Sequence, residues 1–552
     1  MAECQHSRGP DYTGFWDDGS RAALAHNRLA IIDLSPEGRQ PMESEDWVIV
    51  FNGEIYNYAE IRPGLEELGV VFRGHSDTEV LLHCLQRRGL DSTLQLIHGM
   101  FAIAAWHKPS GTLHLVRDRM GIKPLFYHRG EDGSVAFAST AAALARTRAD
   151  KWRLNRGALY EFFRLGAVFS EDTLFAGIQR LDAAHVATFV NGDWSVRRYW
   201  KPEPRSGDLG DLIFTAVEAR RISDVPVCVF LSGGVDSSAV SVILRDVDGV
   251  HLESVEKEYA RHVTDAIGGK LHVVDPQDFD MDAVLSDYAG TSGEPSMAGM
   301  IPYVVSRAIR DLGYIVGISA NGADELFYGY PRMPTPGLPA DHFSLVPHDP
   351  LQQADLTTQL LEIFRHPGNF SVPDSPEPLS LRAFVAQMEE KYFLDGFPRE
   401  SSYRWLELQT YVKYDLNATL DFASMASSVE MREPFLDYRL VECALALDPA
   451  EVVTPEFGRK APLKRILQEA GIHPALWCRA KRGFSLNSKA DQSLRRRRLQ
   501  SVKMLREQGY LRLADAAAWR GNVHRDQAYL FNAAWAFEMW KRVWIDSGIV
   551  TP

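Results

Sequence analysis

The stretch LSGGVDSS at residues 231–238 follows the apolar run VPVCVFL at residues 225–231 and leads into a helical pattern that begins near Ser237. The adjacent glycines Gly233 and Gly234 allow a tight turn and let the backbone come close to an anion. The start of a helix directs free N–H groups at the same point, and the serines add hydroxyl donors. We therefore predict a buried strand, a pyrophosphate-binding loop and a helix, in that order.

A second polar cluster, SANGADELFYGY at residues 319–330, follows the apolar run YIVGI at residues 314–318. Both loops should emerge at the carboxyl ends of neighbouring parallel strands, where open α/β sheets bind their ligands. Asp236 in the first loop and Asp324 in the second are acidic, so their natural role is to hold a magnesium ion that bridges phosphate oxygens. The two loops together predict a magnesium and phosphate site.

The rest of the chain divides into two patterns. Around the two loops, buried-strand runs alternate with helical stretches, which predicts a parallel sheet with helices on its faces. Residues 47–200 instead hold many short strands with turn signals. The cluster KPEPRSGDLG at residues 201–210 is typical of a domain junction. We expect a β-rich first domain at residues 1–200, then an α/β domain with a parallel sheet and a helical carboxyl-terminal part at residues 201–552.

The composition excludes several classes of function. A balance of 60 basic and 73 acidic residues gives a net charge of −13, which argues against nucleic-acid and membrane-surface partners because both require a basic field. The cysteines form no CxxC pair, so neither a disulfide framework nor a zinc site is indicated. We expect a cytoplasmic protein that acts on small molecules. The cysteines are Cys4, Cys84, Cys228, Cys443 and Cys478.

Further motifs carry a family resemblance. The two loops resemble the synthetase domain of class B asparagine synthetases, together with SMASSVEMREPFLDYRLVE (424–442) and RAKRGF (479–484). The first part resembles the family's class II glutamine amidotransferase domain in NRLAIIDLSPEGRQPM (27–42), VFNGEIYNY (50–58), HSDTEV (75–80) and RDRMGIKPLFY (117–127). These motifs cover nearly the whole chain in the family's order. The resemblance implies an α+β first domain of stacked antiparallel sheets flanked by helices.

The resemblance also implies an activity. In this family, ATP activates a small carboxylic acid as its adenylate, and ammonia released from glutamine displaces AMP. It implies ATP and Mg²⁺ as cofactors, ammonia or a small amine as second substrate, and glutamine as a ligand of the first domain, with a homodimer left open. Two other interpretations remain open: an ordinary glutamine-hydrolysing asparagine synthetase with a misplaced start site, and a catalytically inactive binding or regulatory homologue.

Residue roles follow from the matching positions. The resemblance assigns the pyrophosphate to Ser232, Gly233, Gly234, Asp236 and Ser237, and the nucleotide to Leu231, Ser319 and Ala320. It assigns to Lys481 the role of neutralising the negative charge that builds up on the phosphate of the adenylate. It assigns the glutamine pocket to Arg28 for the carboxylate, Asp77 for the α-amino group, Asn52 and Gly53 for the oxyanion hole, and Glu54 beside them.

The first domain departs from the family pattern at its start. The family's glutaminase begins with a cysteine whose own α-amine serves as base for the thiol. Here residue two is Ala2, and Cys4 lies only four residues before RGPD at residues 8–11, which the family reaches much further along. We therefore expect either an inactive first domain that survives as a scaffold or a misplaced start site.

The second domain departs from the pattern at three places. The family's acidic residue, thought to deprotonate the incoming amine, is Asn321 here, and an amide cannot take up a proton at neutral pH. The acceptor region has become GEPSMAGMIP at residues 293–302, which leaves Glu294 as a candidate base. The strand that usually follows the phosphate loop should be missing or shortened within VHLESVEKEY at residues 250–259.

Overall fold

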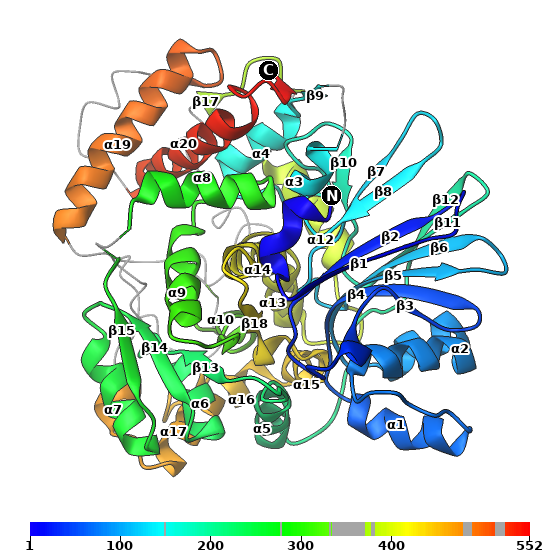
Figure 1. Cartoon of the computed structure of the whole chain (residues 1–552). Helices are drawn as coiled ribbons and strands as arrows, with labels where there is room; N and C mark the ends of the chain where they lie inside the picture. The colour runs from blue at the N-terminus through cyan, green and yellow to red at the C-terminus, as the bar shows by residue number, and fades with distance from the viewer. Residues whose placement is uncertain are drawn as a thin grey trace.

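The computed structural model describes residues 1–147, 151–276, 279–330, 333, 370–376, 381–478, 488–513 and 525–552. Antiparallel sheets occupy the first 200 residues, and one parallel sheet with helices on both faces follows (Figure 1). The predicted fold class is thus confirmed in both parts.

The largest sheet of the first part has six antiparallel strands in the order β12-β11-β6-β5-β4-β3. Side chains alternate between its two faces, as strand geometry requires. Along β4, Ile49 and Phe51 pack under the helices, whereas Val48 and Val50 face the opposite core. The strands are β3 (Met42–Glu43), β4 (Trp47–Ile55), β5 (Gly99–His107), β6 (Thr112–Arg117), β11 (His185–Val190) and β12 (Asp193–Arg198).

Two smaller sheets and several helices complete the first part. One sheet pairs β1 with β2, and the other has the order β10-β7-β8. Helices α1 (Tyr58–Glu67) and α2 (Asp77–Leu96) cover the six-stranded sheet. The remaining elements are η1 (Glu3–Arg8), β1 (Tyr12–Asp17), β2 (Ala23–Arg28), η2 (Pro36–Gly38), β7 (Phe126–Arg129), β8 (Val135–Ala138), α3 (Ala141–Ala145), β9 (Trp152–Arg153), α4 (Arg156–Leu165) and β10 (Ile178–Arg180).

The second part is built on a five-stranded parallel sheet with the order β15-β14-β13-β16-β18. Its strands are β13 (Val227–Phe230), β14 (Asp248–Leu252), β15 (Leu271–Val274), β16 (Val316–Ile318) and β18 (Glu430–Arg432). The strand expected to be missing or shortened after the phosphate loop is present as the five-residue β14. Strand β14 pairs with β13 on one side and β15 on the other, because its buried residues 249–252 fill the sheet interior.

Helices cover both faces of this sheet. Among the described residues, the helices of the second part are α5 (Leu209–Ala219), α6 (Val235–Leu244), α7 (Lys257–Ile267), α8 (Met281–Ser292), α9 (Met300–Asp311), α10 (Ala323–Leu326), α12 (Leu381–Tyr392), α13 (Arg399–Glu407), the π-helical η6 (Leu408–Asn417), α14 (Ala418–Met425), η7 (Pro434–Leu436), α15 (Tyr438–Ala446), α16 (Pro449–Val452), α17 (Ala461–Glu469), α18 (Pro474–Trp477), α19 (Ser488–Glu507) and α20 (Arg525–Trp544). Within β13, Val229 belongs to the core around α5 and α6, and Cys228 to the core around α8 and α9. Short strands β17 (Phe370–Ser371) and β19 (Arg512–Leu513) pair with each other, and β20 (Val550–Thr551) pairs with β9.

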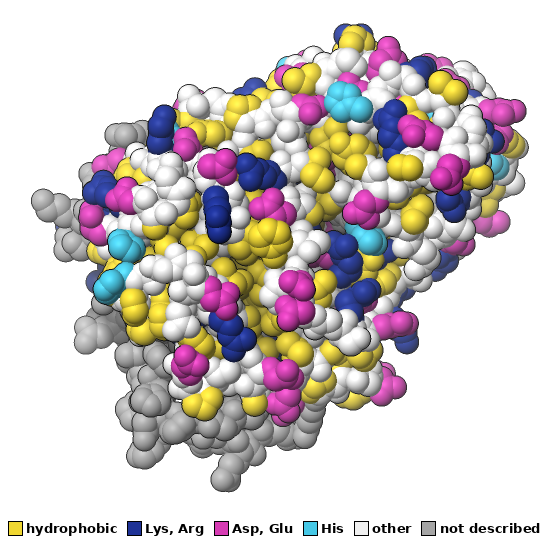
Figure 2. Space-filling view, turned by 90° about the horizontal axis from the view of Figure 1, so that it is seen from below, with side chains coloured by type: hydrophobic (Ala, Val, Ile, Leu, Met, Phe, Trp, Pro, Cys, Tyr) yellow, Lys and Arg dark blue, Asp and Glu magenta, His cyan; other side chains and the backbone are white. Residues whose placement is uncertain are grey.

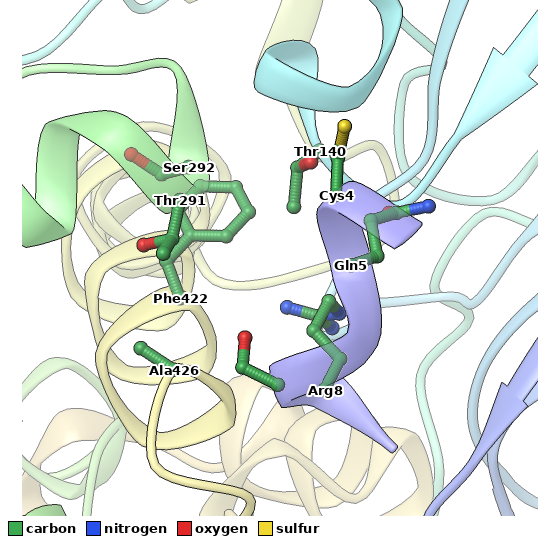
Figure 3. A pocket seen from close by; sticks show the side chains of 9 residues that line it. Cys4, Gln5, Arg8, Thr140, Thr291, Ser292, Phe422 and Ala426 are labelled. Carbon is green, nitrogen blue, oxygen red and sulfur yellow. The ribbon is translucent and has the colours of Figure 1, made fainter. Parts of the chain in front are cut away.

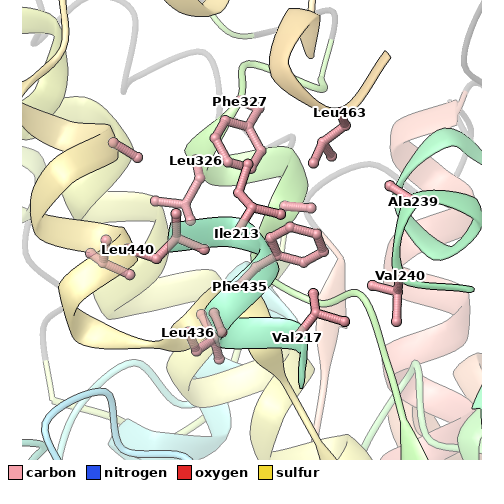
Figure 4. Close-up of a cluster of buried hydrophobic side chains, with 14 of the residues drawn as sticks. Ile213, Val217, Ala239, Val240, Leu326, Phe327, Phe435, Leu436, Leu440 and Leu463 are labelled. Carbon is pink, nitrogen blue, oxygen red and sulfur yellow. The ribbon is translucent and has the colours of Figure 1, made fainter. Parts of the chain in front are cut away.

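One hydrophobic cluster fixes the helices that border the predicted phosphate site (Figure 4). Val240 of α6, Phe327 at the end of α10 and Leu463 of α17 are almost fully buried in it, with Ile213 and Phe435. Burying a side chain of this size contributes about 1.5–3 kcal/mol. The cluster therefore holds three helix ends in register at the carboxyl edge of the sheet.

The surface shows no dominant field on the face that Figure 2 presents. Basic and acidic side chains are interspersed there, with hydrophobic side chains between them. None of the helices in the described ranges combines the length and the apolar character needed to span a membrane.

Candidate functional site

The loop after β13 has the geometry of an anion cradle. Gly233 has a φ of +82°, and a Cβ at this position would lie 2.8 Å from the Glu256 carbonyl oxygen, so only glycine fits. The Ser237 hydroxyl lies 3.0 Å from the Ser232 hydroxyl and accepts the Ser232 N–H at 3.2 Å. Gly234 caps α6 without a side-chain acceptor. The first N–H groups of α6 therefore have no side-chain cap at this end.

The second loop emerges beside the first. Strand β16 pairs in parallel with β13, so both loops leave the same edge of the sheet, as predicted. The chain runs outward from β13 to β14 and β15 and then returns to β16 on the other side of β13, which makes this edge a topological switch point. The Ser319 N–H donates to the Arg432 carbonyl at 2.9 Å, and the Ser319 hydroxyl accepts the Asn321 N–H at 3.3 Å. Ala320 packs against the core.

A lysine joins the two predicted metal ligands. The Nζ of Lys460 lies 2.5 Å from an Asp236 carboxylate oxygen and 2.5 Å from an Asp324 carboxylate oxygen. Asp236 lies in the first turn of α6, Asp324 on α10, and Lys460 at the start of α17. Burial alone would lower the pKa of Lys460, but the two carboxylates raise it above its ordinary value. The ammonium group is thus charged, and the two carboxylates converge on one cationic atom.

The backbone around Lys460 is shaped for this contact. Lys460 is left-handed, with a φ of +61°, and its N–H donates to the Phe327 carbonyl at 3.1 Å. Arg459 donates to the carbonyls of Tyr328 and Tyr330 at 2.9 and 2.8 Å. Gly329 lies so close that any Cβ there would collide with Asp324 and with the Lys460 side chain. The segment after α10 and the start of α17 therefore form one interlocked unit.

The donor set suits Mg²⁺. Carboxylate oxygens are hard ligands, and Mg²⁺ is usually held by one or two carboxylates with substrate phosphates and water supplying the rest. The described part of the chain contains no group of three or more His, Cys, Asp or Glu side chains placed to hold a metal. Asp236 and Asp324 therefore fit a magnesium ion that arrives with a phosphate ligand better than an all-protein metal cage.

A second lysine lies behind the first. Lys464 is one helical turn beyond Lys460 on α17 and donates to the Phe457 carbonyl at 2.6 Å. Burial lowers the pKa of its ammonium group to about 8, although the carboxylate of Asp236 acts in the opposite direction. This edge of the sheet therefore carries two lysines from a helix to which the sequence motifs assigned no role.

A cleft of about 550 Å³ in the first part collects the predicted glutamine-pocket residues. Its lining includes all five of them, namely Arg28, Asn52, Gly53, Glu54 and Asp77. Met425 and Glu430 of the second part also line it. The cleft is therefore closed by residues from both parts of the chain.

The cleft is polar on its β4 side. Gly53 has a φ of +141°, and a Cβ there would collide with the Met100 carbonyl of the paired strand. The Nδ2 of Asn52 is buried and has no hydrogen-bond partner among the described residues. Arg28 donates to the carbonyls of Ser35 at 2.8 Å, Ile32 at 3.3 Å and Asp33. The cleft thus offers an unpaired amide donor beside a buried guanidinium group.

Two carboxylates line the cleft in different settings. The Glu54 carboxylate lies 2.9 Å from the guanidinium of Arg432, and burial raises its pKa despite that partner. Asp77 accepts the Ile55 N–H at 2.9 Å, and burial raises its pKa to about 6. Of these two carboxylates, Glu54 is paired with an arginine, whereas Asp77 accepts a backbone N–H. Asp77 is therefore the one suited to bind an ammonium group on a ligand.

The remaining predicted residues lie elsewhere. Lys481 falls outside the described residues. Glu294 is buried and paired with Arg180 of the first part, and burial raises its pKa. Its hydrogen bonds are made with Arg180 and Ser292, and not with Asn321 or the two aspartates. Cys4 lines a second pocket of about 230 Å³ with Ser292 (Figure 3). This pocket shares Arg8 with the cleft that collects the glutamine-pocket residues, but Cys4 does not line that cleft.

Lys460 and Arg459, which connect the two loops, were not singled out by any motif. The sequence FGRKAP holds the one signal that could have located them. Pro462 lies at the second position of α17 and marks the start of that helix, so Lys460 is the residue just before its first turn. Arg432 lay within the motif SMASSVEMREPFLDYRLVE, but nothing in that motif revealed its partner Glu54 almost 400 positions earlier.

Comparisons with known proteins agree with this arrangement. A family model described as glutamine amidotransferase domain matches residues 1–200, and one described as asparagine synthase matches residues 208–544. Asparagine synthetase [glutamine-hydrolyzing] 3 of Bacillus subtilis is 30% identical over 524 residues, covering 86% of this chain and 81% of the relative. Asparagine synthetase [glutamine-hydrolyzing] 1 of the same organism is 29% identical, covering 85% and 80%. A solved glutamine phosphoribosylpyrophosphate amidotransferase from B. subtilis covers 49% of this chain and 61% of its own at 15% identity, with a TM-score of 0.27, too distant to support a structural argument. The chain belongs to the asparagine synthase family, and its activity is that of an ATP-dependent carbon–nitrogen ligase that releases AMP and pyrophosphate.

Proposed function

We propose that the protein forms an amide bond by adenylating a small carboxylic acid with ATP and then letting ammonia or a small amine displace AMP. The observation that carries this proposal is the convergence of Asp236 and Asp324 on one cationic atom beside the phosphate-type loop. Such a pair supports Mg²⁺-dependent binding of a nucleotide at the switch point of the sheet.

Each part of this edge has a role in the proposal. The N–H groups at the start of α6 and the hydroxyls of Ser232 and Ser237 hold the β and γ phosphates, which leave as pyrophosphate. Leu231, Ser319 and Ala320 border the nucleotide. Asp236 and Asp324 hold Mg²⁺, which when bound neutralises charge on the phosphates. Lys481, which lies outside the described residues, is proposed to meet charge on the adenylate phosphate.

The reaction balances without a further reactant. A carboxylate oxygen attacks the α phosphorus of ATP, the α–β phosphoanhydride bond breaks, and pyrophosphate leaves. The amine nitrogen then attacks the activated carbonyl carbon, the carbon–oxygen bond to AMP breaks, and the nitrogen loses a proton. Because Asn321 cannot accept that proton, another acceptor is required, and a weakly basic amine gives the proton up more readily. Glu294 is a poor candidate acceptor in this conformation, because Arg180 already holds its carboxylate.

The chain is proposed to form two domains, at residues 1–200 and 201–552. The first of them is proposed to bind glutamine in its cleft. The buried, unpaired Nδ2 of Asn52 and the carboxylate of Asp77 support this, since one could meet a carbonyl oxygen and the other an α-ammonium group. Glutamine-hydrolysing asparagine synthesis, as in the B. subtilis relatives, is the second candidate function, and this cleft is the observation that favours it.

A screen of carboxylic acids for ATP–pyrophosphate exchange tests the proposal. The purified protein with Mg²⁺ should incorporate labelled pyrophosphate into ATP only when the right acid is present. Formation of ADP and phosphate instead would rule out an adenylate. Isothermal titration with glutamine, compared between the wild-type protein and Asp77→Asn, separately tests the cleft.

A further inference from the structure

Lys460 occupies the position in which the metal of the proposed reaction would sit. Its ammonium nitrogen is 2.5 Å from oxygens of both Asp236 and Asp324. The lysine side chain is 8% exposed, and the two carboxylates are 17% and 15% exposed. Such limited solvent access strengthens the interactions between these charges compared with the same groups in water.

The fold holds Lys460 there at a cost. A residue with a side chain is disfavoured in the left-handed region by roughly 1 kcal/mol, yet Lys460 has a φ of +61°. Its N–H bond to Phe327 fixes that conformation, and the absence of a side chain at Gly329 leaves room for the contact. Neither feature is needed for a surface lysine. The local structure is therefore built around the lysine and the two aspartates.

The charges make the lysine and a metal mutually exclusive at this place. Two carboxylates that converge on one point repel each other unless a cation lies between them. One ammonium group reduces their summed charge from −2 to −1. A divalent cation on the same oxygens would lie close to the ammonium nitrogen, and that repulsion must drive one of the two cations away.

We propose, on the basis of the proposed function, that Lys460 is a tethered counter-cation that keeps Mg²⁺ out of the two-aspartate site until nucleotide arrives. When Mg²⁺ and ATP bind together, the phosphates supply new acceptors for the ammonium group, so Lys460 moves from the carboxylates to phosphate oxygens. Mg²⁺ alone offers no such acceptor and must compete with the lysine directly. Lys460 is therefore a positioning residue that couples metal entry to nucleotide entry.

Isothermal titration of the full chain tests this coupling. Lys460→Met and Lys460→Gln should bind Mg²⁺ without nucleotide at least ~10-fold more tightly than wild type, because the competing ammonium group is removed. A tenfold change in Kd corresponds to about 1.4 kcal/mol. Both variants should bind ATP at saturating Mg²⁺ more weakly, by at least ~5-fold, because a phosphate partner is lost. Lys460→Arg keeps the charge and should restore weak binding of Mg²⁺ alone. Lys257→Met, which removes a half-exposed lysine paired with Glu253, is the matched control and should match wild type.

A labelling experiment on wild type covers the case in which the variants do not fold. The acetylation rate of Lys460, followed by mass spectrometry, should be the same with and without Mg²⁺ alone and should change when Mg²⁺ and ATP are both present. A change of equal size with Mg²⁺ alone would overturn the proposal, as would variants that bind Mg²⁺ like wild type. Failure of wild type to bind ATP with Mg²⁺ would instead reject the proposed function.

Discussion

The guanidinium of Arg432 lies 2.9 Å from the carboxylate of Glu54, and this ion pair joins the cleft of the first part to the parallel sheet of the second. The same guanidinium lies 2.8 Å from Glu430, which also lines the cleft. The carbonyl oxygen of Arg432 accepts the N–H of Ser319 at 2.9 Å. One fully buried residue of β18 therefore contacts two residues that line the cleft with its side chain, and the loop that begins at Ser319 with its backbone.

Arg432→Met should strongly destabilise the protein. The change leaves Glu54 and Glu430 buried near each other with their shared cation removed, and breaking such a buried pair costs about 3–5 kcal/mol. Thermal unfolding followed by circular dichroism measures the effect as a fall in the apparent Tm. Arg221→Met is the matched control, since that arginine forms an exposed pair with Asp246, and it should change the Tm little. Equal shifts in the two variants would contradict the assignment.

Asp236→Asn and Asp324→Asn should each slow ATP–pyrophosphate exchange by at least ~100-fold. The change removes one negative charge from the proposed metal site while keeping the shape of the side chain, and a metal-bound charge contributes several kcal/mol to the transition state. Exchange assays across a Mg²⁺ series measure the effect. Asp248→Asn, on the neighbouring strand but bonded to Tyr314 and His272, is the control. Rates within a few-fold of wild type in either site variant would contradict the two-aspartate site.

The sequence allowed the architecture of the site to be predicted because its signals are local. A strand, a Gly-rich turn and a helix lie within one stretch of chain, and parallel pairing then brings Asp236 and Asp324 to the same edge. Lys460 and Arg432 could not be predicted in this way. Their partners are distant in sequence, and only the folded chain shows which buried charges meet. The presence of strand β14 could not be predicted either, because its sequence departs from the family pattern and the strand is stabilised by pairing with β13 and β15 on its two sides.

Cys4→Ala should leave any glutamine cleavage by the protein unchanged. Cys4 lines a pocket beside η1, α8 and α14, and this pocket shares Arg8 with the cleft that holds Asp77, but Cys4 is not among the residues that line that cleft. A nucleophile must lie within reach of the bound carbonyl carbon. Release of glutamate from glutamine measures the activity in both proteins, with Asp77→Asn as a variant that should weaken glutamine binding. Loss of cleavage in Cys4→Ala alone would show that the thiol reaches the cleft.

Asp415→Asn should stabilise the protein at pH 8 but not at pH 4. Burial raises the pKa of Asp415 from 3.8 to about 7, even though Thr419 donates a hydrogen bond to it. Between those two values the folded protein keeps a proton that the unfolded chain has lost, so the wild-type free energy of unfolding falls as pH rises, by up to about 4 kcal/mol. The asparagine does not titrate. Chemical denaturation at several pH values should show the variant gaining on wild type from pH 4 to pH 7, and a constant difference would contradict the buried, protonated carboxyl group.

Asn321→Asp should raise the rate with ammonia near neutral pH and leave the rate with weakly basic amines almost unchanged. Asn321 is half-buried on the loop after β16, three residues before Asp324, and only its backbone N–H is engaged, by Ser319, in the contacts found at that loop. Its amide cannot accept the proton that ammonia must lose when it attacks the adenylate, whereas a carboxylate of the same shape can. A hydroxylamine or hydrazine reaches the site unprotonated at neutral pH and needs that help less. The loop itself should not change, because the left-handed position belongs to Gly322, with a φ of +89°, and not to residue 321.

Rates of AMP release with each nucleophile from pH 6 to pH 9 make the comparison, and Asn321→Ala separates the effect of the new carboxylate from the loss of the amide. A gain of equal size with every nucleophile would mean that position 321 shapes the site without accepting the proton.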